Sequence, residues 1–193
     1  MLLAVVALTG CKKLHLTDLA PLGQAGMYFA DVEQLRQLGV SDTEVAQLVS
    51  ARQAGVTDGT CIELVRIVHM RHRLFTDGQA VAGLVHAGIE ENTVLELARL
   101  DQLGLWSGEA LALRLSGLSD SVILAVARRR AAAQPVLSGA KVAALKNAGL
   151  SEAQILIDIN GGIGDDQADR IIAQRNYAAG GHSFVRQGQR RRR

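Results

Sequence analysis

The strongest constraint on the fold is a short recurring pattern: a glycine, an aliphatic residue, usually a hydroxyl residue, and then an acid. Glycine accepts the left-handed conformation that ends a helix, and the aliphatic residue covers the helix end. The following Ser or Thr caps the next helix, whose positive dipole end favours Asp or Glu. Each copy therefore predicts a helix, a tight turn and another helix. Six copies begin at Gly39, Gly55, Gly88, Gly117, Gly149 and Gly162.

Two further signals support helical hairpins as the repeating unit. Ser41 with Glu44, and Ser151 with Gln154, have the spacing of capping boxes at helix starts. A second series of hydroxyl landmarks, Thr76, Ser107 and Ser138, is evenly spaced along the chain. Their period of about 31 residues matches two helices of roughly 11 residues with their turns, which is typical of a helical repeat. Between the landmarks the apolar residues follow helical spacing.

Composition agrees with an all-α fold. The hydrophobic fraction is 48%, yet aromatic residues make up only 3%, so aliphatic side chains and alanine must fill the core. We expect about ten short helices in repeated hairpins over residues 30–178. Such short helices depend on packing against neighbours for their stability. The hairpins could form a compact bundle or a short solenoid, and the irregular junction spacing favours the bundle.

The first residues form an apolar run too short to span a bilayer. Residues 1–10 are typical of the apolar core of an export signal, although no charged residue precedes the run. Leu8-Thr9-Gly10-Cys11 resembles the lipobox of bacterial lipoproteins. The resemblance implies cleavage before Cys11, lipidation of that cysteine, and a membrane-anchored protein of the bacterial cell envelope. Alternatively, residues 2–9 open the fold, Cys11 is an ordinary thiol, and the protein is cytoplasmic.

Two segments flank the expected helical domain. Residues 11–29 lack a sustained period and contain a Pro/Gly cluster, which predicts a linker. Residues 179–193 are expected to form a disordered basic tail. Five arginines in residues 186–193 account for the net charge of +2, and the remaining chain carries about −3. Attraction to phosphates or anionic lipid is therefore concentrated at this end.

The repeated element is cleanest in Val142–Glu152, which reads Val-Ala-Ala-Leu-Lys-Asn-Ala-Gly-Leu-Ser-Glu. This element is similar to repeats in poorly characterised bacterial envelope proteins. The resemblance implies no known activity, and it leaves a helical-repeat module that binds a protein partner as the expected function. The partner and the oligomeric state are not encoded in the pattern.

The last junction differs because a second glycine replaces the capping hydroxyl. Gly162-Ile163-Gly164, followed by Ala168 and then Arg175, resembles the helix-hairpin-helix motif of DNA-binding proteins. That resemblance implies sequence-independent binding of a DNA phosphate at backbone N–H groups of Gly162 and Gly164. Arg170, Arg175 and the arginine tail would add phosphate contacts, whereas acids at positions 165 and 166 would oppose them. The alternative interpretation is a sixth structural turn.

Other groups give little indication of catalysis. His69 and His72 lie three apart on an expected helix, where they could share a metal or form part of a solvated basic face. Cys61 lies among aliphatic residues, as a buried thiol would. The sequence contains no supported nucleophile–base pair, P-loop or dinucleotide fingerprint. We therefore expect a non-enzyme without cofactor or metal.

Overall fold

The computed structural model describes residues 17–190, and every regular element in this range is an α-helix. The all-α fold predicted from the sequence is thus confirmed. The eleven helices of the described range are α1 (Ala20–Gln24), α2 (Phe29–Leu38), α3 (Asp42–Gln53), α4 (Asp58–His69), α5 (Gly78–His86), α6 (Glu91–Arg99), α7 (Leu103–Leu115), α8 (Asp120–Ala131), α9 (Gly139–Asn147), α10 (Glu152–Gly161) and α11 (Asp165–Arg190).

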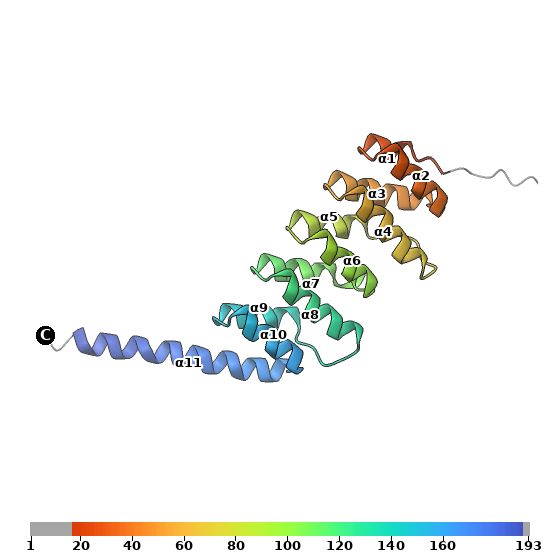
Figure 1. Ribbon diagram of the computed structural model, residues 1–193. Coiled ribbons are helices and arrows are strands. Elements are labelled where there is room, and N and C mark those ends of the chain that lie inside the picture. The colour runs from red at the N-terminus through yellow and green to blue at the C-terminus, as the bar shows by residue number, and fades with distance from the viewer. Residues whose placement is uncertain (1–16, 191–193) are drawn as a thin grey trace, which may run out of the picture.

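The helices form two layers. Each odd-numbered helix packs on the next odd-numbered helix, from α1 through α11, and each even-numbered helix packs on the next even-numbered one. Figure 1 shows the two rows side by side in a stack of hairpins. Within the described range, contacts join successive hairpins and do not close the two ends onto one another. The arrangement is therefore a short solenoid, one of the two arrangements that the sequence left open.

The predicted glycine stops are confirmed, because all six junction glycines have positive φ angles. A further one, Gly26 (φ 86°), ends the turn after α1. Four of the predicted junctions connect an odd helix to an even helix, whereas those at Gly39 and Gly162 connect an even helix to an odd one. The six copies thus belong to two opposite edges of the array.

On the even-to-odd edge, three turns use left-handed residues other than glycine, namely His72, Asp101 and Ala133. The intervals between successive left-handed residues are unequal, but the same series of intervals occurs on both edges of the array. The matching series are Gly39, His72, Asp101 and Ala133 on one edge and Gly55, Gly88, Gly117 and Gly149 on the other. Because both layers share the irregular spacing, neighbouring hairpins stay in register. The irregular junction spacing, which had favoured a closed bundle, is therefore compatible with a stack of hairpins.

The core runs along the interface between the layers. Phe75, Trp106 and Leu137, which are evenly spaced in the sequence, are all buried at corresponding positions. The hydroxyl landmarks beside them do not all start helices. Ser138 caps α9 by accepting a hydrogen bond from the Lys141 N–H, but α7 begins at Leu103, so Ser107 lies inside a helix.

The N-terminal boundary of the array differs from the prediction. Residues 11–29 were expected to be a linker, but α1 lies within this segment and packs on α3. Leu19, Leu22 and Met27 are buried there, and they give the first hairpin its share of the core. Helix α1 has too few turns to produce a periodic signal, which explains why the pattern missed it.

The C-terminal boundary also differs, because α11 continues to Arg190, whereas residues 179–193 were expected to be disordered. Counted from the N-cap residue, the stop glycines Gly88 and Gly149 occupy the same position after α5 and α9. The equivalent position in α11 holds Arg175, and the next residue is Asn176 instead of an aliphatic residue. Since the stop signal is missing, the helix runs past the array, as Figure 1 shows.

Both terminal helices of the even layer carry polar residues on the side where a further even helix would pack. Glu33 and Arg36 of α2 form a 3.0 Å ion pair where α4 has Ile62 and Val65 at the corresponding positions. In α10, Asp158 replaces the leucine or valine that is buried in the same place in the other even helices, Leu35, Leu64, Leu97 and Val126. Terminal repeats with a polar outer face are typical of soluble repeat arrays.

Candidate functional site

An acid opens each of α4, α6, α8 and α10, and it binds the preceding hairpin. Three carboxylates accept hydrogen bonds from the N-cap backbone N–H of the even helix before them, at 2.9–3.0 Å: Asp58 from Tyr28, Glu91 from Thr57, and Asp120 from Glu90. Hydrogen bonds from Ser119 lower the pKa of Glu152 in the same way. The sequence explained these acids by the dipole of their own helix, but the structure shows that they also join neighbouring repeats.

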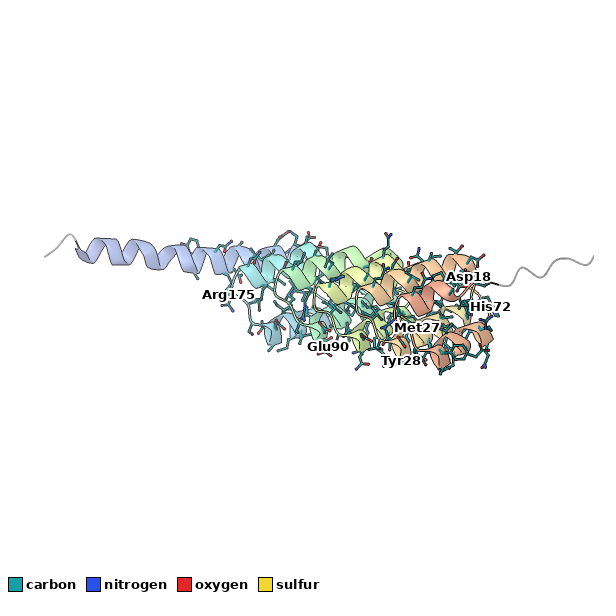
Figure 2. The ribbon with its side chains drawn as sticks, turned by 90° about the horizontal axis from the view of Figure 1, so that it is seen from above. Asp18, Met27, Tyr28, His72, Glu90 and Arg175 are labelled. Atoms are coloured by element: carbon teal, nitrogen blue, oxygen red, sulfur yellow. The ribbon has the colours of Figure 1, made fainter. Side chains whose placement is uncertain are left out.

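Two arginines in the last turns of odd helices complete this edge. Arg52 forms a 2.8 Å ion pair with Asp58 and donates to the carbonyl of Gly26 at 3.1 Å. Arg114 donates to the carbonyl of Gly88, one repeat earlier. Figure 2 shows Tyr28 and Glu90 along this edge. The polar groups of the edge are thus largely engaged in holding repeats together.

A buried carboxylate performs the same task at the opposite edge. Glu44 is fully buried, and it accepts hydrogen bonds from Ser41 N, from Phe75 N and from His69 Nε2, the last at 2.7 Å. Burial alone would raise the pKa of Glu44, but these hydrogen bonds outweigh burial and hold the pKa below its ordinary value. The carboxylate therefore links α3, the end of α4 and the turn before α5.

The two histidines do not form a metal site. Helix α4 ends at His69, and His72 lies beyond it in a left-handed turn. His69 is bound to Glu44, so it is not part of a solvated basic face as the sequence suggested. Among the described residues, no group of three or more His, Cys, Asp or Glu side chains could hold a metal ion. Cys61 is fully buried, and burial raises its pKa to about 12, as expected for an unreactive thiol.

The hairpin that resembles the DNA-binding motif is occupied by contacts within the protein. Arg129 donates to the Asn160 carbonyl at 2.9 Å, and its guanidinium would lie 2.6 Å from a Cβ at Gly162. Packing therefore explains Gly162, in addition to its φ of 73°. Asp165 accepts hydrogen bonds from the backbone and hydroxyl of Ser138, at 3.0 and 2.9 Å. Its carboxylate is thereby held on α9.

Gly164 and the two basic residues of the motif have no such structural role. A Cβ at Gly164 would meet nothing within 4 Å, and this residue precedes the first residue of α11. Arg170 and Arg175 are exposed on α11, and neither forms an ion pair with the described part of the chain. Figure 2 shows Arg175 near the place where α11 leaves the array. The motif residues are thus divided between one glycine packed against Arg129 and three exposed residues.

The outer face of the even layer is covered by a chain of paired charges, which we call the ion ribbon. It joins α2, α4, α6 and α8 through Gln34, Glu63, Arg66, Glu96, Arg99 and Arg128. The distances range from 2.6 Å for Arg99–Glu96 to 4.0 Å for Arg128–Glu96. Covering this face with a partner would require removing water from many charges, which is unfavourable.

The outer face of the odd layer has the opposite character, and we call it the uncharged face. Helices α3, α5, α7 and α9 each expose or half-expose three residues at i, i+4 and i+7, and none of the twelve carries a formal charge. They are Ala46, Ser50, Gln53, Gln79, Gly83, His86, Gly108, Ala112, Leu115, Ala140, Ala144 and Asn147. Most of these side chains are small, and Leu115 is 75% exposed.

The first hairpin contains a cavity of about 470 Å³, lined by Leu19, Gly23, Met27, Phe29 and Val32 among others. Phe29 is 84% exposed at its rim. A smaller cavity of about 200 Å³ lies between the turns that follow α4 and α6. There Asp101 is bound to Arg73 at 2.5 Å, and burial together with Asp101 raises the pKa of Asp77. The residues that line these two cavities do not include a nucleophile paired with a base.

The proposed lipidation residue Cys11 and the signal-like segment 1–10 lie outside the described residues. No described helix is both long and apolar enough to cross a membrane. Comparison of the chain with protein-family models, with curated proteins and with solved structures finds no match.

Proposed function

We propose that the chain is a non-catalytic interaction module of the bacterial cell envelope, tethered to a membrane through a lipid on Cys11. Its protein partner binds the uncharged face of the odd layer. The main support is the contrast between the two outer faces, since one is covered by the ion ribbon and the other has no formal charge at twelve positions. Desolvating the uncharged face costs less than desolvating the ion ribbon, and small side chains allow close approach.

The tether is supported by the lipobox-like Leu8-Thr9-Gly10-Cys11. We expect cells that express the chain to incorporate a radioactive fatty acid into it, and a Cys11→Ser variant to lose the label. The matched control is Cys61→Ala, which removes a buried thiol and should keep the label. Equal labelling of the Cys11→Ser variant would contradict the tether.

The binding face can be tested by site-specific photocrosslinking in cells. We expect a photoreactive residue at Ala112, on the uncharged face, to form one defined adduct with a partner protein. The matched control is Ser121 on α8, which is also exposed but belongs to the even layer. Ala46→Arg on α3 should weaken the Ala112 adduct without changing the melting temperature. Equal adducts from both positions, or none from Ala112, would exclude this face.

DNA binding through the hairpin is the alternative function. Exposed Arg170 and Arg175 favour it, but the Gly162 and Ile163 N–H groups already donate to the carbonyls of Ile159 and Asp158, at 3.0 and 3.3 Å. Asp166 remains exposed at the start of α11, where a DNA phosphate would have to approach. The interaction module is therefore the better supported proposal.

A further inference from the structure

Charge is segregated between the array and its last helix. Residues 170–193 contain seven arginines and no acidic residue, whereas the preceding residues carry 14 basic and 19 acidic side chains. Many charged groups of the array are paired across repeats, as in the ion ribbon. The arginines of residues 170–193 therefore have no acidic residue among them to neutralise.

The fold separates this basic segment from the array. Helix α11 contacts α9 through its first turns, where Ala168 is buried and Ile171 and Ile172 are half-buried. From Ala173 to Ala178 every residue is exposed, and Tyr177 is 85% exposed. Because Arg175 replaces the glycine stop, the helix projects beyond the stacked hairpins (Figure 1). We call residues 170–190 the basic arm.

We propose that the basic arm binds the anionic headgroups of a phospholipid membrane. The arm carries four arginines, and three more follow it in the sequence. Clusters of four to eight basic residues bind anionic bilayers through the negative surface potential, and their binding is strongly salt-dependent. The proposed tether on Cys11 would keep the arm close to such a surface. In this respect the inference rests on the proposed tether, although the arm's affinity for lipid can be measured without it.

A lipid surface suits the surroundings of the arm better than a nucleic acid does. A duplex lying along the arm would also approach its base, where Asp166 and Asp169 are exposed. Those carboxylates would repel the dense phosphate charge of DNA. A planar membrane can contact the projecting part of the arm without reaching the base. The Gly162 and Ile163 N–H groups also donate to carbonyls within the fold, which leaves fewer donors for a phosphate backbone.

The test uses the full chain with Cys11→Ser, so that no lipid modification contributes. We expect it to co-sediment with vesicles of phosphatidylcholine containing about one third phosphatidylserine, and not with phosphatidylcholine alone. Raising salt from about 0.1 M to about 1 M should release it. Changing Arg175→Gln and Arg186→Gln together, both beyond the part of α11 that packs on α9, should weaken partitioning roughly 25-fold, or about fivefold for each arginine.

The control removes two exposed arginines from the array instead, through Arg36→Gln and Arg66→Gln, and should leave partitioning nearly unchanged. Equal loss in the control, or equal binding to neutral vesicles, would overturn the proposal. Displacement from vesicles by duplex DNA at equal phosphate concentration would reassign the arm to nucleic acid. Fatty-acid labelling tests the tether separately. If the chain is labelled but its Cys11→Ser form does not bind anionic vesicles, only the proposal for the basic arm is refuted.

Discussion

Replacing Gly78 with alanine is expected to lower the free energy of unfolding by about 3 kcal/mol, because the added methyl group has no space. Gly78 is buried at the start of α5 and donates its N–H to the Gln47 side chain at 3.0 Å. A Cβ there would overlap the Gln47 carbonyl group and lie 2.7 Å from Gln47 Cα. Since the obstacle is backbone, α3 and α5 would have to separate. Urea unfolding followed by circular dichroism measures the change.

Two other glycines provide controls for this prediction. A Cβ at Gly139 would meet the Glu109 side chain, which can move, so Gly139→Ala should cost only about 1 kcal/mol. Gly83 lies within α5 with nothing within 4 Å of a Cβ, so Gly83→Ala should stabilise by about 0.5 to 1 kcal/mol. If Gly78→Ala proved as mild as Gly139→Ala, the close approach of α3 and α5 would be wrong.

Glu44→Gln is expected to destabilise the protein by about 3 kcal/mol at neutral pH, because a neutral amide cannot accept all the hydrogen bonds that reach the buried carboxylate. The donors are the Ser41 and Phe75 N–H groups and His69 Nε2. The amide nitrogen of the variant side chain is itself a hydrogen-bond donor. It would therefore face one of these three donors, and neither of the two would have an acceptor. Urea unfolding measures the loss. The control Glu33→Gln changes an exposed carboxylate and should cost less than about 0.5 kcal/mol.

The same carboxylate should make stability depend on acid pH. The pKa of Glu44 is lower in the folded protein than its ordinary value of 4.5, so the folded state favours the ionised form. Its contribution is present above about pH 4.5 and is lost as pH falls through the folded pKa. The stability difference between the wild-type chain and Glu44→Gln should therefore shrink on acidification. A constant difference down to acid unfolding would show that Glu44 is not ionised in the fold.

Of the two capping boxes predicted from the sequence, one is confirmed and the other is only half formed. Ser41 and Glu44 form the reciprocal capping box that their spacing indicated. At Ser151 only half of the box exists, because the Gln154 side chain donates to Asp158 at 3.2 Å instead of turning back to the N-cap. Ser119 does not cap its own helix, and its hydrogen bonds to Glu152 join α8 to α10. A partner in the neighbouring repeat can thus replace a local one.

The sequence predicted less of the candidate site than of the fold. The uncharged face is visible only after the odd helices are known to be neighbours, since its members come from four separated segments. Leu115 gives a weak signal, because it ends α7 outside the helical spacing of the buried residues Trp106, Ala110 and Leu113. The motif residues Gly162 and Gly164 were recognisable in sequence, but the contacts of Arg129 were not.

The all-helical class and the glycine stops follow from local sequence, because a left-handed turn and a capping hydroxyl act within a few residues. Gly39 and Gly162 have the φ angles that this local chemistry requires. The remaining features depend on contacts between repeats, so only the fold shows them. The fold has left-handed turns at His72, Asp101 and Ala133, although none of these residues is a glycine. It also shows that the junction acids bind the preceding repeat and that α11 continues past Arg175, because packing between neighbouring repeats outweighs local preference.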